Sequence, residues 1–248
     1  MPAVTPPTIC AAPEPTKHRD PLPVHPPLSE ALKASRWARE LTPAQFERVC
    51  AETTERQVPA GGYIVRKGEP VDVWLGVIEG LVKINADSAA GKSVTFAGVT
   101  TGGWLGEGSM LKNEARRYDV VALRDSRVAF LPRATFEWLL DNSIPFNRFL
   151  LVQLNERLGQ FIAMVEHDRL LDIDARVARC LAALYNPVLY PGTTAQLQIS
   201  QEEVGYLSGA SRQRVNQALQ VLEREHLLKV EYGGITILDV EGLRHFRA

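Results

Sequence analysis

The chain has 248 residues, of which 45% are hydrophobic and 23% are charged, and its formal net charge is −1. This length leaves room for two globular domains, and the balanced charge does not by itself indicate a nucleic acid or membrane partner. Cys10, Cys50 and Cys180 lie far apart and the histidines form no HExxH motif, so neither a disulfide framework nor a metal site is predicted. No apolar run approaches the roughly 18 residues of a membrane helix, and the N-terminus lacks a charged start followed by an apolar core, so we expect a cytoplasmic protein.

Residues 1–28 contain nine of the 16 prolines and almost no large apolar side chains. Such a segment cannot bury enough surface to offset its ordering entropy, which predicts a disordered or polyproline-like tail. Structure is expected to begin with a helix capped by Ser29 and extending to about Ala38. A second helix should begin at Thr42, because Pro43 and Gln45 follow it at the positions typical of a helix start.

Residues 55–132 contain short β-type runs separated by glycines, which is typical of a sandwich, roll or barrel. The predicted strands are residues 63–65, 73–78, 81–84, 94–99, 118–123 and 128–131. A polar segment interrupts these strands, and it consists of Gly106, Glu107, Gly108 and Ser109, followed by Arg116, Arg117 and Tyr118.

A short helix over residues 134–140 should precede a long helix with large side chains at alternating steps of three and four. These positions are Ile144, Asn147, Leu151, Leu154, Leu158, Phe161 and Val165. Sustained spacing of this kind predicts a two-stranded coiled coil, with Asn147 as a register-setting contact. The predicted dimer contacts are Leu151, Leu154, Leu158, Phe161 and Val165. Packing of the helix against its own domain is the open alternative.

The next helix should begin at Asp172 or Asp174 and bury Ile173, Val177, Leu181 and Leu184. Further along, Ser200 and Glu203 form a capping box that begins another helix. Gly209 can take the positive φ of a tight turn, and Ser211 can cap the helix that follows. Two short helices joined in this way predict a helix-turn-helix over residues 199–228.

The second helix of this motif has one apolar and one polar face. The predicted DNA contacts are Ser211, Arg212, Gln213, Arg214, Asn216 and Gln217. Guanidinium and amide groups can bond base edges in pairs, while Arg214 lies to the side and suits a phosphate. A solvated surface face is the alternative, since Arg and Gln are also good helix formers.

Two β-branched runs, residues 227–231 and 235–238, surround a Gly-Gly pair and predict a hairpin, which makes the motif a winged helix. Asp239 should cap a final helix. Residues 171–248 contain eight Lys plus Arg and nine Asp plus Glu, a net of 8 − 9 = −1. DNA affinity would therefore have to come from a local positive patch, helix N-termini and two copies acting together.

The order of PAGGYIVRKGEP, GGWLGEGSML with a nearby arginine, a long helix and LSGASRQRVNQALQVLE resembles the Crp/Fnr transcription regulators over about residues 29–238. The resemblance implies an α+β fold. Its parts would be a proline-rich tail (1–28), a cyclic-nucleotide-binding-type, jelly-roll-like β-roll (29–143), a dimerisation helix (144–170) and a winged helix-turn-helix (171–248).

In nucleotide-binding members of the family, the glutamate of a Gly-Glu element holds a ribose hydroxyl, and an arginine followed by Ser or Thr holds the phosphate. Glu107 matches this glutamate, and Arg116 or Arg117 matches the arginine, but Arg117 or Tyr118 stands where the hydroxyl residue belongs. Two interpretations stay open. The basic side chains hold an anion, or Arg117 pairs with Asp119 or Glu107 in an unliganded roll.

Family members that recognise adenine use polar residues late in the long helix, where this chain has Phe161, Ile162 and Ala163. Arg157 is the charged candidate that faces the roll. The effector site implied by the resemblance is Gly106 to Ser109, Arg116, Arg117, Tyr118 and Arg157. Its ligand would be a small anion or a cyclic nucleotide, cyclic AMP is disfavoured, and no resident cofactor is predicted.

The chain has no GxSxG motif, Walker loop or nucleophile–base signature, so we expect no enzyme activity. The predicted function is a homodimeric, sequence-specific DNA-binding transcription regulator that binds an inverted-repeat operator. RNA polymerase is a further partner implied by the resemblance. The alternative is a sensor of cyclic nucleotides or small anions whose winged helix contacts proteins and binds no DNA.

Overall fold

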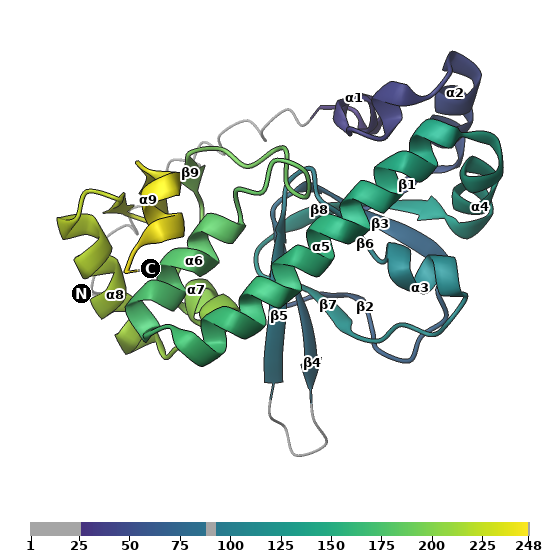
Figure 1. Ribbon diagram of the computed structural model, residues 1–248. Helices are drawn as coiled ribbons and strands as arrows, with labels where there is room; N and C mark the ends of the chain where they lie inside the picture. Colours follow the sequence, from purple (N-terminus) through teal and green to yellow (C-terminus); the bar gives the residue numbers. More distant parts are fainter. Residues whose placement is uncertain (1–25, 88–92, 248) are drawn as a thin grey trace, which may run out of the picture.

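The computed structural model describes residues 26–87 and 93–247. Within these ranges the chain forms a β-roll, one long helix and a smaller helical domain with its own three-stranded sheet (Figure 1). Nearly all of the proline-rich tail, and Cys10 with it, lies outside the described residues, as does Gly91, one of the glycines between the predicted strands. No helix of the described part is long and apolar enough to cross a membrane.

The N-terminal helices differ in part from the prediction. Helix α1 (Leu28–Ala34) begins after Pro27 and has no side-chain cap, so the predicted cap at Ser29 is wrong. The helix also ends earlier than predicted, because Ser35 turns into an extended conformation and a 3-10 turn, η1 (Ala38–Glu40), follows. Helix α2 (Pro43–Glu52) has the predicted capping box between Thr42 and Gln45.

The roll consists of two four-stranded antiparallel sheets packed face to face. In spatial order the first contains β1 (Thr54–Val58), β8 (Ser126–Pro132), β3 (Val73–Glu79) and β6 (Trp104–Leu105). The second contains β2 (Tyr63–Val65), β7 (Asp119–Ala122), β4 (Leu81–Asp87) and β5 (Ser93–Thr100). The six predicted strands are confirmed, whereas β1 and β6 were not predicted. Helix α3 (Glu107–Lys112) follows β6.

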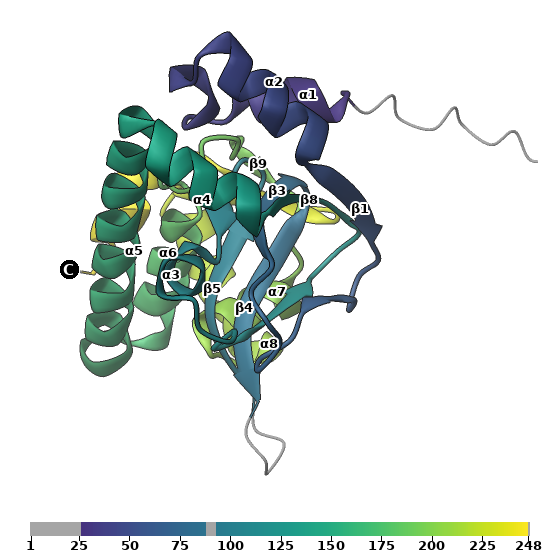
Figure 2. The same ribbon diagram turned by 90° about the vertical axis from the view of Figure 1, so that its right-hand side faces the viewer.

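An aromatic cluster holds the start of the long helix against the roll. Trp37 and Trp74 pack on Trp104, with ring centroids 5.0 and 4.4 Å from it, and Phe146 of the long helix lies 5.7 Å from both Trp37 and Trp74. Helix α4 (Arg133–Asn142) precedes the long helix α5 (Ile144–Leu170) and adds Phe136 to this cluster. Figure 2 shows α5 along one side of the roll, with α1 and α2 over one end.

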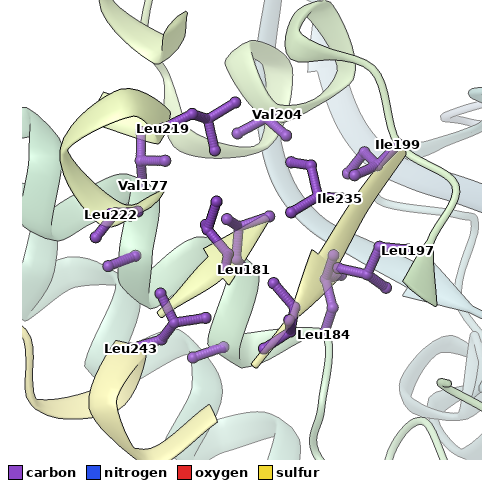
Figure 3. Packing of buried hydrophobic residues seen from close by; sticks show 14 of the residues in the cluster. Val177, Leu181, Leu184, Leu197, Ile199, Val204, Leu219, Leu222, Ile235 and Leu243 are labelled. Atoms are coloured by element: carbon purple, nitrogen blue, oxygen red, sulfur yellow. The ribbon is translucent and has the colours of Figure 1, made fainter. Parts of the chain in front are cut away.

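The C-terminal domain is the predicted winged helix. It contains α6 (Ile173–Ala183), α7 (Gln201–Ser208), α8 (Arg212–Arg224), α9 (Val240–His245) and a sheet ordered β10 (Leu228–Glu231), β11 (Gly234–Ile237), β9 (Gln196–Leu197). Asp172, rather than Asp174, caps α6. Every helix and β11 contribute to one core, as Figure 3 shows for Leu181, Val204, Leu219, Ile235 and Leu243. This common core positions α8 on the surface.

Candidate DNA-binding, dimer and effector sites

The helix-turn-helix has the predicted local geometry. The Ser200 hydroxyl accepts from the Glu203 N–H, and the Glu203 carboxylate accepts from the Ser200 N–H. Gly209 ends α7 with φ +66°, a left-handed conformation that glycine adopts without strain. Ser211 then caps α8 by accepting from the Arg214 N–H at 3.4 Å. These contacts fix the angle at which α8 leaves the turn.

The two faces of α8 are separated as predicted. Val215, Ala218, Leu219 and Leu222 are fully buried. All six predicted DNA contacts are exposed: Ser211, Arg212, Gln213, Arg214, Asn216 and Gln217. Within the described part of the chain, Arg212 and Gln213 have no hydrogen-bond or ion-pair partner, so both side chains can turn toward a ligand.

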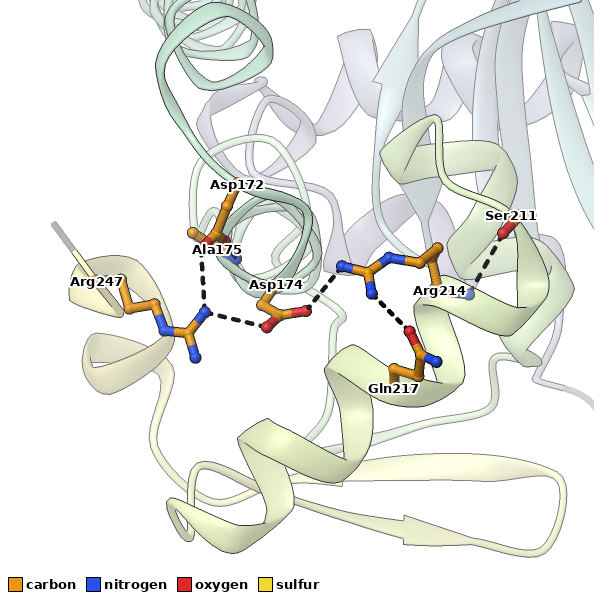
Figure 4. A network of polar contacts seen from close by, with 7 residues as sticks. All are labelled: Asp172, Asp174, Ala175, Ser211, Arg214, Gln217 and Arg247. Atoms are coloured by element: carbon orange, nitrogen blue, oxygen red, sulfur yellow. Dashed lines mark hydrogen bonds and ion pairs between the residues drawn. The ribbon is translucent and has the colours of Figure 1, made fainter.

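The other polar side chains of this face are held by neighbours that the sequence did not indicate. Arg214 donates to Gln217 Oε1 at 2.6 Å and lies 3.9 Å from Asp174 of α6 (Figure 4). Arg247 bonds both Asp172 and Asp174 at 3.0 Å. The Ala175 N–H, and then Arg247, hold the pKa of Asp172 below its usual range. The start of α6 is therefore joined to α8 and to the C-terminus through charged groups.

Helix α5 has an apolar stripe on the side away from the roll. Its most exposed large hydrophobic residues are Leu170 (74%) at its C-terminal end, Ile144 (69%), Leu151 (68%), Ile162 (59%), Leu158 (58%), Val152 (49%) and Val165 (46%). Leu151, Leu158 and Val165 belong to the predicted dimer contacts, whereas Leu154 and Phe161 are half-buried against their own chain. A continuous exposed stripe of this kind is typical of a helix that pairs with another copy.

Asn147 does not belong to this stripe, and its predicted role as a register contact is wrong. Its side-chain amide donates to Leu140 O at 2.7 Å and to Ser143 O at 2.9 Å. Those carbonyls end α4 and begin α5, so Asn147 stabilises the corner between the two helices of one chain.

The structure places Glu107 at the start of α3, after Gly106 with φ +96°. Glu107 is only 3% exposed, and one of its carboxylate oxygens has no partner in the described structure. The other oxygen lies 3.6 Å from Arg157 Nε of α5. The buried guanidinium also donates to Trp104 O at 2.9 Å and to the Tyr190 hydroxyl at 3.3 Å. Glu107 and Arg157 thus form the polar centre of the candidate effector site.

Arg116 lies beside this centre, and Arg117 does not. Arg116 is 4% exposed and donates to Val73 O at 2.8 Å, and burial lowers its pKa. A Cβ atom built on Gly106 would lie 3.3 Å from Arg116 Nη1, so the two segments are adjacent. Burial, with Glu107 nearby, raises the pKa of Tyr118 to about 12.

The exposed Arg117 forms two hydrogen bonds of 2.8 Å with Glu114. Its predicted pairing with Asp119 or Glu107 is therefore wrong. Asp119 instead accepts from the Lys67 N–H at 2.8 Å. The reason is local, because the loop after α3 turns the Arg117 side chain outward while it turns Arg116 inward. Gly108 and Ser109 lie within α3, directly after Glu107.

Two family models match two separate parts of the chain. The cyclic nucleotide-binding domain model matches residues 55–143, and the Crp-like helix-turn-helix domain model matches residues 175–246. The transcriptional regulator SdrP of Thermus thermophilus is 28% identical over 189 residues, covering 75% of this chain and 90% of that protein. The cAMP-activated global transcriptional regulator Vfr of Pseudomonas aeruginosa is 25% identical over 193 residues, with the same coverages of 75% and 90%.

A solved structure has the same fold. The structure of FixK2 from Bradyrhizobium japonicum superposes with a TM-score of 0.66 at 18% identity, and the match covers 79% of this chain and 98% of that one. The order of roll, long helix and winged helix is therefore shared with it.

Proposed function

Because the chain belongs to the Crp/Fnr family of DNA-binding transcription regulators, we propose that it acts as a homodimer in which two copies of α8 bind an inverted-repeat operator. The observation that carries this proposal is the free polar face at the start of α8. Arg212 and Gln213 are exposed there, and they follow directly on the cap at Ser211. The alternative function, a sensor that acts through protein contacts without DNA, is not favoured.

Local charge supports DNA binding although the domain as a whole is slightly acidic. Helix α8 contains Arg212, Arg214 and Arg224 against one carboxylate, Glu223, a net of 3 − 1 = +2. Its N-terminus adds a partial positive charge from unpaired backbone N–H groups. Ser211, Arg214, Asn216 and Gln217 would complete the contact, with Arg214 released from Asp174 to reach a phosphate.

The proposed division of the chain is a sensor over residues 29–143, a dimerisation helix over 144–170 and a DNA-binding domain over 171–248. The stripe on α5 supports the dimer, and its proposed contacts are Leu151, Leu158 and Val165, with Leu154 and Phe161 at the edge. RNA polymerase is a further proposed partner, because the relatives above are transcriptional regulators.

The proposed effector site comprises Gly106 to Ser109, Arg116, Tyr118 and Arg157, and its ligand is a small anion or a cyclic nucleotide. Vfr is cAMP-activated by name, but two features of this chain disfavour cyclic AMP. Arg116 is followed by Arg117 rather than by a hydroxyl residue, and residues 161–163 are apolar. Arg116 is buried, whereas Arg117 is exposed and bonds Glu114, so Arg116 is the proposed anion contact.

Selection of bound sequences from a random DNA pool tests the function. The parent should enrich an inverted repeat whose half-sites lie about 34 Å apart. Arg212→Ala and Gln213→Ala should each relax the preference at particular positions, because a lost bidentate contact typically removes roughly 1 to 3 kcal/mol of discrimination. Arg214→Ala should weaken binding to all sequences and reduce its salt dependence.

Arg224→Ala is the matched control, since Arg224 is an exposed arginine at the opposite end of α8 whose guanidinium donates to Gln220 O. It should leave the selected sequence unchanged. Enrichment of no inverted repeat by the parent would refute the proposed function.

A further inference from the structure

A loop of the DNA-binding domain is docked on the roll. Residues 186–193, here called the docking loop, connect α6 to β9. Both ends are fixed within the DNA-binding domain: Leu184 lies in its core, and Ala195 O accepts from Ile237 N of the wing at 2.9 Å. The tip of the loop, however, belongs to the core of the roll, because Leu189 and Tyr190 are 2% and 1% exposed within it.

Backbone contact holds the tip closely. A Cβ atom at Gly192 would lie 2.7 Å from Thr101 O, and one at Gly102 would lie 3.0 Å from Gly192 N. Only glycine permits this approach of the two chain segments. The Thr193 hydroxyl adds a bond of 2.6 Å to the Thr100 hydroxyl. The loop is therefore seated against the roll by shape as well as by polar contacts.

A chain of polar contacts runs from the tip to the Glu107 carboxylate. The Tyr190 hydroxyl accepts from Arg157 at 3.3 Å and donates to Gln160 Oε1 at 3.1 Å. Arg157 in turn lies 3.6 Å from Glu107. One guanidinium thus contacts both the candidate effector site and the DNA-binding domain. Any ligand that binds Glu107 or Arg157 changes the electrostatic environment of the Tyr190 hydroxyl.

We infer that Tyr190 is a coupling residue through which the DNA-binding domain senses the pairing of Glu107 with Arg157. The docking loop transmits the change, since its ends are built into α6 and the wing sheet while its tip is built into the roll. The inference rests on the proposed function for its biological meaning, but the coupling itself is a property of the full-length chain. Coupling of this kind must be reciprocal, because each side alters the same equilibrium.

Hydrogen exchange of the full-length protein tests both directions. Glu107→Gln preserves the shape of the side chain but removes its charge, and it should speed exchange in the docking loop. Tyr190→Phe removes only the hydroxyl and keeps the packing of the ring, and it should speed exchange across residues 104–112. Each change should be about two- to tenfold, the range expected for one lost hydrogen bond. The double variant should show no more change than the larger single one.

Tyr185→Phe is the matched control, because its hydroxyl donates to Thr194 O and Ala195 O at 2.9 and 3.0 Å and does not contact the roll. It should leave residues 104–112 unchanged. Gly192→Ala is a second test, since the added methyl group should lift the tip and speed exchange at both sites without altering any polar side chain.

Two results would overturn the inference. One is a change of exchange confined to the segment that carries the substitution, either the docking loop or residues 104–112. The other is additive effects in the double variant. DNA selection by the parent separates this result from the function. If the parent selects an operator and the exchange effects stay local, the inference alone fails. If the parent selects none and the reciprocal effects are present, the proposed function fails and the coupling stands.

Discussion

Substitution of Leu158 should dissociate the dimer. Leu158 lies near the middle of the α5 stripe with 58% of its surface exposed. Full burial of a leucine side chain stabilises by about 1.5–3 kcal/mol, so burying the exposed 58% corresponds to about 1–2 kcal/mol in each protomer. Two copies meet at a symmetric seam, which gives roughly 2–3.5 kcal/mol per dimer. Leu158→Ala should therefore weaken dimerisation roughly 30- to 300-fold.

Leu158→Glu should have a larger effect, because it places two like charges in an apolar contact at a further cost of several kcal/mol. Sedimentation equilibrium at micromolar concentration should show a dimer for the parent and a monomer for this variant. Leu238→Glu is the control, since Leu238 has the same 58% exposure but lies beside the wing. Circular dichroism should confirm that both variants fold. A dimer of unchanged affinity for Leu158→Glu would place the interface elsewhere and refute the assignment of the stripe.

Three further predictions concern the two domains. Cys180 is half-buried, and burial of its thiol raises the pKa to about 12. At pH 8 the thiol should therefore stay protonated and react with iodoacetamide far more slowly in the folded protein than after denaturation, whereas equal rates would contradict the raised pKa. Ser200→Ala removes the hydroxyl that caps α7 and should lower the free energy of unfolding by about 1 kcal/mol. Calorimetry should show a melting temperature lower by about 2–4 °C, and an unchanged melting temperature would show that the cap contributes nothing. Titration calorimetry with cyclic AMP should show no micromolar binding, and a micromolar dissociation constant would refute the argument from Arg117 and residues 161–163.

The winged helix could be predicted from sequence because its signals are local. The capping box, the turn glycine and the second cap each bond a group three or four residues away in the chain, so the residue types alone determine which groups bond. The burial of Val215 and Leu219 follows from helical periodicity in the same way. The exposed side of α8 then follows as the face that remains.

The missed strands lack such signals. Strand β1 has the sequence TERQV and is exposed at its first four residues, so no alternation of apolar and polar side chains marks it. It forms because it pairs with β8 along its whole length, in five residue pairs from Thr54 with Phe130 to Val58 with Ser126. Strand β6 has only two residues, Trp104 and Leu105, and depends on its pairing with β3. In both, tertiary contacts decide the conformation.

Heptad spacing alone could not show which row of α5 is exposed. Leu151, Leu158 and Val165 recur every seven residues. A spacing of three and four residues allows a second row of apolar side chains on either side of this row. The roll occupies one of those sides, where Asn147 bonds the end of α4. The stripe is therefore completed by Ile162 on the other side, which is 59% exposed. Only the position of the roll decides between the two rows.

The position of the roll also gives α5 two different faces, one buried and one exposed. Leu158 lies on the exposed stripe, while the adjacent Arg157 is buried between Glu107 and Tyr190. A rotation or shift of α5 that relieves or strengthens the Arg157 contacts must also move Leu158, because the helix is hydrogen-bonded without a break from Ile144 to Leu170. Two α5 helices paired at Leu158 would share that shift. In the proposed dimer the spacing of the two α8 helices would depend on the same pairing. A change at Glu107 would then reach the DNA-binding surface by two routes, the docking loop within one protomer and the α5 seam between protomers.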